Sequence, residues 1–112
     1  MINQLRIYEI PKTNRGPFHD RFRDQAMPIF ERYGFRIQAV WESQRDDKLY
    51  FVYLLAWRDA DEMQTAWADF LADPEWTEIK RVTGAQHGTY VNGIEEFTLN
   101  PTDYSTAIER LA

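Results

Sequence analysis

The sequence predicts an α+β protein of the ferredoxin-like type, with the element order β-α-β-β-α-β. Four short segments, at residues 2–10, 35–43, 49–57 and 94–99, have the composition of strands. Apolar residues recur at helical spacing between the first and second of these segments, and again between the third and fourth. The chain has 112 residues, which is enough for one domain with a core and too few for two. We therefore expect a single domain over residues 1–112.

The first strand, residues 2–10, alternates between two faces. Leu5 and Ile7 share one face, and Arg6 and Tyr8 share the other. This alternation is typical of a strand with one buried side.

The first helix is expected to begin at Gly16 and Pro17 and to end at Gly34, a residue type that commonly follows the last turn. Pro28 lies inside the helical pattern and should bend it, because proline removes one backbone hydrogen bond and crowds the preceding turn. The apolar stripe of this helix contains Phe18, Phe22, Ala26, Ile29, Phe30 and Tyr33.

The second and third strands, residues 35–43 and 49–57, are separated by the polar run 44–48. A short polar connection between two strand-like segments predicts an antiparallel hairpin.

Two helices joined by a bend are predicted after the third strand. Asp59 should cap the first, since Glu62 lies three positions later and completes a capping box. Asp73 should end this helix because it precedes Pro74, and it should then cap the second helix. The second helix is expected to close near Gly84. The apolar stripe of the first contains Met63, Ala66, Trp67, Phe70 and Leu71, and we assign Trp67 and Trp76 to core packing.

The third strand, LYFVYLLAW at residues 49–57, is apolar or aromatic at every position, which predicts burial on both faces. Two helices of one chain cover only one face of a sheet. Burying each further large apolar side chain contributes about 1.5–3 kcal/mol, so the other face should also be covered. We expect a second copy to cover it about a two-fold axis, which gives a homodimer of the dimeric α/β barrel type. The alternative is a monomer whose open face is sealed by the C-terminal tail.

Composition excludes several classes of function. The formal net charge of −5 disfavours nucleic-acid binding, and the absence of cysteine excludes disulfides and thiolate metal sites. Two histidines are too few for most imidazole metal sites, and no phosphate-binding glycine loop is present, so no metal or cofactor is expected. No segment approaches the ~20 apolar residues of a membrane helix, and because the strand-like pattern begins within a few residues of Met1, no signal peptide is expected. A cytoplasmic protein without membrane contact is the resulting expectation.

Several short motifs resemble those of one known family. The first-strand LRIY at 5–8, the MP and YG pairs within 27–34, and AVW at 39–41 have counterparts in the NIPSNAP family. The run WADFLADPEW at 67–76 is similar to the end of that family's second helix, and NPTDYS at 100–105 resembles its closing segment. The resemblance implies a ferredoxin-like fold that pairs as a dimeric α/β barrel. It implies little about activity, because most members have no assigned reaction.

Arg6 and Tyr8 are the first candidates for ligand contacts. If the other face of their strand meets the helices, both side chains point into the barrel between two subunits. Arginine there could bind a substrate carboxylate through a two-pronged contact. The structural alternative is an ion pair of Arg6 with a glutamate of a neighbouring strand or subunit, with Glu9, Glu42 and Glu95 available.

Three further aromatic or titratable residues complete the candidate site. Trp41 and Tyr53, on strands of one sheet, could line an aromatic cavity, although strand aromatics also serve simply as core or interface. His19 could transfer protons at the mouth of the barrel, or could be an ordinary exposed helix histidine.

Two hypotheses of function follow. The first is a pocket for a small aromatic or carboxylate compound, in a protein of the cofactor-independent oxygenase or isomerase type, for which His19 or Tyr8 would be the base. This is an analogy at the level of the fold. The second is a non-enzymatic module that binds a ligand or a protein. The sequence assigns no catalytic residue, and an enclosed cavity that touches Arg6 and Tyr8 would favour the first hypothesis.

Overall fold

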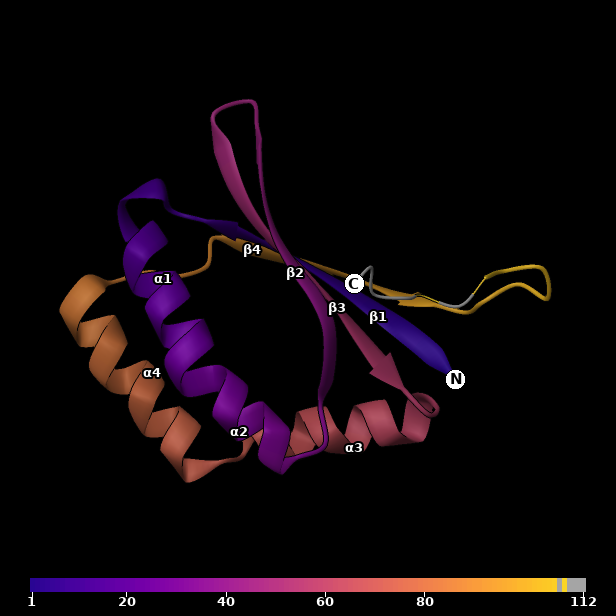
Figure 1. Ribbon diagram of the computed structural model, residues 1–112. Coiled ribbons are helices and arrows are strands. Elements are labelled where there is room, and N and C mark those ends of the chain that lie inside the picture. Colours follow the sequence, from indigo (N-terminus) through magenta and orange to yellow (C-terminus); the bar gives the residue numbers. More distant parts are fainter. Residues whose placement is uncertain (107, 109–112) are drawn as a thin grey trace.

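The computed structural model describes residues 1–106 and 108. Its four-stranded antiparallel sheet carries every helix on one face, as Figure 1 shows, and the strand order is β2-β3-β1-β4. This is the predicted ferredoxin-like α+β arrangement. The strands are β1 (Ile2–Ile10), β2 (Arg36–Arg45), β3 (Lys48–Trp57) and β4 (Gly93–Leu99).

The first helical segment is continuous but changes its winding before Pro28. The Met27 N–H donates to the carbonyl of Phe22, five residues earlier, in one wide π-helical turn. A π-helical turn accommodates a proline, which has no N–H to donate. The irregularity that the sequence predicts at Pro28 is therefore this π turn. The segment ends before Gly34, whose φ of +79° places it in the left-handed region that favours glycine. Its parts are a 3₁₀ turn (Lys12–Asn14), α1 (Arg15–Arg21), the π turn (Phe22–Ala26) and α2 (Met27–Arg32).

The two later helices begin at the predicted caps. The Asp59 carboxylate accepts from the Glu62 N–H at 2.8 Å, and the Asp73 carboxylate accepts from the Trp76 N–H at 3.0 Å. The helices are α3 (Ala60–Leu71) and α4 (Pro74–His87).

Helix α4 is longer than the sequence indicated. It passes through Gly84 and ends at Gly88, where φ is +77°. The Gly88 N–H donates to the Gly84 carbonyl at 2.8 Å and closes the last turn. Gly84 itself is therefore an ordinary helical residue.

The core lies between the helices and the sheet, and β3 runs through its centre. Every second side chain of β3 is at most 1% exposed and packs toward the helices, namely Leu49, Phe51, Tyr53, Leu55 and Trp57. The intervening residues, on the other face, are half-buried or buried within the single chain: Tyr50, Val52, Leu54 and Ala56.

Strand β1 faces the helices with the side opposite to the one expected. Gln4 is 2% exposed and accepts a hydrogen bond from Trp67 of α3, and Arg6 lies over the same indole ring. Leu5 and Ile7 therefore lie on the open face, so the condition under which Arg6 and Tyr8 would point into a barrel between two subunits is not met. The physical reason is that both sides of this sheet can bury apolar groups, so alternation alone does not choose between them.

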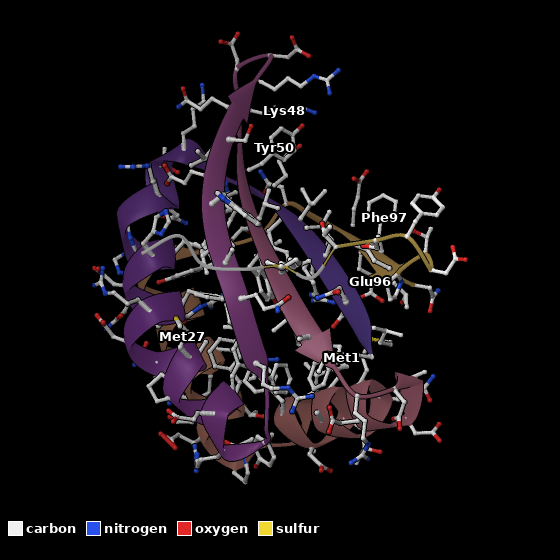
Figure 2. The ribbon with its side chains drawn as sticks, turned by 45° about the vertical axis from the view of Figure 1, so that its right-hand side comes forward. Met1, Met27, Lys48, Tyr50, Glu96 and Phe97 are labelled. Atoms are coloured by element: carbon white, nitrogen blue, oxygen red, sulfur yellow. The ribbon has the colours of Figure 1, made fainter. Side chains whose placement is uncertain are left out.

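The open face carries several exposed apolar side chains. Trp41 is 49%, Phe97 50% and Leu99 41% exposed. Figure 2 shows Phe97 on β4 and Tyr50 on the β2–β3 hairpin. Among the described residues, no helix is both long and apolar enough to cross a bilayer, and no group of three metal-ligating side chains gathers in one place.

Candidate functional site

A cavity of about 200 Å³ lies between the helices and the sheet. A cavity of roughly 150 Å³ holds a benzene molecule, so this one has room for a single substituted ring. The aromatic walls are Phe18, Phe22, Phe30, Trp67, Phe70 and Trp76. The polar side chains that line it are Arg6, Tyr8, Arg21 and Lys80.

Arg6 forms one wall of the cavity and is already engaged by protein groups. Its guanidinium lies 4.2 Å from the centre of the Trp67 ring and forms an ion pair with Glu96. Two of its N–H groups donate to the Tyr8 hydroxyl, at 3.0 and 3.3 Å. Burial lowers the pKa of Arg6, but the Tyr8 and Tyr53 oxygens outweigh this and raise it overall, so the group stays cationic. An ion pair of Arg6 is thus present, but its partner is Glu96 and none of the three glutamates named from the sequence, because Glu96 lies directly opposite Arg6 in the β1–β4 register.

Tyr8 and Tyr53 form a hydroxyl pair, with their oxygens 2.6 Å apart. Tyr53 is fully buried, and burial raises its pKa well above the usual range, so it keeps its proton. Among the described residues, the Tyr8 oxygen is the acceptor within reach of that proton. Either hydroxyl can be the donor of this hydrogen bond, and the Tyr8 oxygen also accepts from Arg6.

Gln4 holds the wall behind this pair. Its side-chain oxygen accepts from the indole N–H groups of Trp57 at 3.0 Å and Trp67 at 2.8 Å. Its amide nitrogen donates to Glu96 at 3.2 Å. One buried amide thus fixes the Trp67 ring on which Arg6 lies.

The other two candidates lie elsewhere. His19 contacts the Glu42 carboxylate at 2.5 Å, and Arg15 binds the same carboxylate at 2.8 and 3.0 Å, which holds the pKa of Glu42 below its usual range. Trp41 stands on the open face of the sheet, and neither His19 nor Trp41 lines the cavity. Among the candidates, the structure thus brings together Arg6, Tyr8 and Tyr53; Arg6 and Tyr8 line the cavity, and Tyr53 is buried behind Tyr8.

Sequence reasoning missed two cations of the site. Arg21 and Lys80 both line the cavity, and neither is among the candidate residues of the sequence analysis. Arg21 lies three positions after Phe18, at the border of the apolar stripe, which is the one sequence signal that could have indicated it. Trp67 and Trp76 do pack in the core as expected, and each also lines the cavity.

The fold and the site together define a ferredoxin-like α+β domain with a ring-sized cavity between its helices and its sheet. The sequence model of the NIPSNAP family matches residues 3–106, and the chain belongs to this family. Comparison with curated proteins finds no match.

Solved structures agree on the fold. An uncharacterized NIPSNAP-like domain protein from Burkholderia xenovorans is 21% identical, with a TM-score of 0.78 over 99% of this chain and 93% of its own. A NIPSNAP family protein of unknown function from Agrobacterium tumefaciens is 16% identical, with a TM-score of 0.77 over 94% and 91% of the two chains. A monooxygenase from Streptomyces coelicolor, in complex with the ligand nanaomycin D, is 8% identical, with a TM-score of 0.59 over 96% and 92%. At these identities the likeness shows the fold alone.

Proposed function

We propose that this protein binds a small compound with one aromatic ring and a hydrogen-bond acceptor in the cavity between its helices and its sheet. The observation that carries this proposal is the ring-sized cavity itself, which has aromatic walls and a few polar side chains, Tyr8 and Arg6 among them. Ligand sites are typically apolar concavities with a few positioned polar groups. The complex of the Streptomyces coelicolor monooxygenase with nanaomycin D supports ligand binding by this fold.

A pair of ketone and hydrocarbon probes tests this function. Indan-1-one carries an acceptor oxygen and indane does not, while their rings have the same size. We expect both to quench the fluorescence of Trp67 and Trp76, with indan-1-one bound more tightly. Tyr8→Phe should weaken indan-1-one binding about 2- to 10-fold, the value of one neutral hydrogen bond, and leave indane binding unchanged. Absence of binding by both compounds would refute the proposal.

Oxidation of a bound hydroquinone by dioxygen is a second candidate. One hydroquinone would give two electrons and two protons to one O2, which yields benzoquinone and hydrogen peroxide, and Tyr8, between Arg6 and Tyr53, is the proton-transferring group that the geometry favours. Oxygen uptake in a sealed cell with hydroquinone as substrate tests it. We expect uptake above the rate of buffer alone for the wild type and its loss in Tyr8→Phe. Oxygen uptake equal to that of buffer alone would contradict this activity and would leave ligand binding without catalysis as the proposed function.

The proposed assembly is a homodimer whose open sheet faces meet. It is supported by the exposed apolar side chains of Trp41, Phe97 and Leu99, which lie on that face beside the half-buried β3 residues. Light scattering should give twice the 13.4 kDa of one chain. Phe97→Lys should shift the mass to that of the monomer. Val82→Lys is the matched control, because Val82 is also exposed (37%) but belongs to α4. A wild-type mass of one chain would contradict the dimer.

A further inference from the structure

We infer that Arg21 and Lys80 form an anion site at the mouth of the cavity and select aromatic monocarboxylates. The ring of such a compound would occupy the cavity and its carboxylate would lie between the two cations. The inference rests on the proposed function, because it concerns the same cavity. It assigns the carboxylate contact to these two residues, since Arg6, the arginine first considered for that role, is paired with Glu96.

Among the residues that the structure describes, Arg21 has no charged partner, and aromatic rings and a hydroxyl hold it in place. Its guanidinium lies 3.9 Å from the centre of the Tyr90 ring and 5.2 Å from that of Trp76. One N–H donates to the Thr83 hydroxyl at 3.2 Å, which leaves most of the five donors of this group unused. Burial lowers the pKa of Arg21, which reflects the cost of removing the cation from water. An anion at this position would offset that cost.

Lys80 approaches the same place from the opposite helix. Its ammonium group lies 5.9 Å from the Trp76 ring, so this indole lies next to both cations. Leu71, Lys80 and Ile94 are exposed members of the cavity lining, and exposed lining residues mark its opening. The ammonium group is therefore at the mouth, and the aromatic walls lie further inside.

The absence of carboxylate partners at this site is unusual for this protein. Within the described part of the chain, Arg21, Lys80 and Lys12 are the only lysines and arginines with no acidic side chain at ion-pair distance. The chain has a formal net charge of −5, so acidic partners are plentiful elsewhere. Two of the three unpaired cations nonetheless lie at one cavity. An exchangeable anion, with charge-assisted hydrogen bonds to both, fits this arrangement.

A matched pair of ligands tests the inference. 3-Phenylpropionate and 3-phenylpropionamide share the ring and the arm length and differ in charge. We expect the acid to bind at least tenfold more tightly than the amide at low salt, and the preference to shrink as salt is added. Arg21→Gln should remove about a factor of ten from acid binding, and Lys80→Gln, at an exposed position, a few-fold. Amide binding should be unchanged in both variants.

Lys12→Gln is the control, because Lys12 is also unpaired but does not line the cavity. It should leave the binding of both compounds unchanged. Circular dichroism should show that Arg21→Gln is folded. If Arg21→Gln does not fold, the binding of the acid and the amide by Lys80→Gln still tests the inference. Equal affinities for acid and amide, or a preference that survives in the folded variants, would overturn the inference while the proposed function stands. Failure of both compounds to bind would overturn both.

Discussion

Replacing Gln4 by leucine should destabilise the protein although the two side chains are similar in size. The Gln4 side-chain oxygen is the acceptor for two indole N–H groups, those of Trp57 and Trp67. Gln4 is 2% exposed, and leucine cannot accept a hydrogen bond. The substitution therefore leaves both donors without this partner inside the core.

The magnitude depends on how far each indole is from water. Trp57 is 0% exposed, so its orphaned N–H cannot be hydrated. Trp67 is half-buried beside the cavity, where water can partly replace the amide. An unsatisfied buried donor costs about 1–3 kcal/mol, and we expect a total loss of about 2–4 kcal/mol in the free energy of unfolding.

Guanidinium denaturation followed by far-ultraviolet circular dichroism measures this loss, since tryptophan fluorescence would itself respond to the changed indoles. The midpoint should fall while the slope with denaturant stays constant. Gln64→Leu is the matched control, because Gln64 is exposed on α3, and it should stay within about 0.5 kcal/mol of the wild type. A Gln4→Leu loss as small as that of the control would refute the assigned role of this amide.

Three further substitutions concern stability. Gly84→Ala should stabilise the protein by about 0.5–1 kcal/mol, because Gly84 lies inside α4 and an added Cβ meets nothing within 4 Å. Gly88→Ala should instead destabilise it by about 1–2 kcal/mol, because φ is +77° there. Thermal unfolding measures whether each variant is more or less stable than the wild type. A change in the same direction for both variants would contradict the reasoning. Hydrogen bonds from the Tyr33 hydroxyl at 2.5 Å and the Trp76 N–H at 3.0 Å hold the pKa of Asp73 below its usual range. The stability that this carboxylate contributes is present above about pH 4 and is lost as the pH falls toward its folded-state pKa. Tyr33→Phe should flatten this acid dependence in denaturation midpoints taken from pH 2 to 6, and an unchanged profile would show that the hydroxyl does not set it.

Local patterns were sufficient to predict most of the fold. The capping aspartates, Asp59 and Asp73, act within three residues of themselves, and both cap as expected. The proline in the first helix and the glycine at its end likewise affect only the backbone next to them, so their effects could be predicted from the sequence. The end of α4 was missed because a glycine signals a helix end only when its φ is positive, and Gly84 and Gly88 look alike in sequence.

The candidate site was predicted in part. Arg6 and Tyr8 were recognised because they share a strand face, and this relation follows from the period of a strand. Tyr53 joins them through the β1–β3 register, in which Arg6 lies opposite Tyr53. Arg21 could not be assigned to the cavity, because its position depends on how the first helix packs against α4.

The sequence by itself determined the order of the elements, their caps and the surplus of apolar side chains on β3, since these depend on residues close together in the chain. Only the tertiary structure decided which face of β1 meets the helices. It also decided that the cavity lies inside one chain and that Arg6 is paired with Glu96, 90 positions away. The physical reason is that strand alternation has two equivalent orientations when both faces of a sheet can be buried. Contacts such as that of Gln4 with the two indoles, which no local pattern contains, distinguish between them.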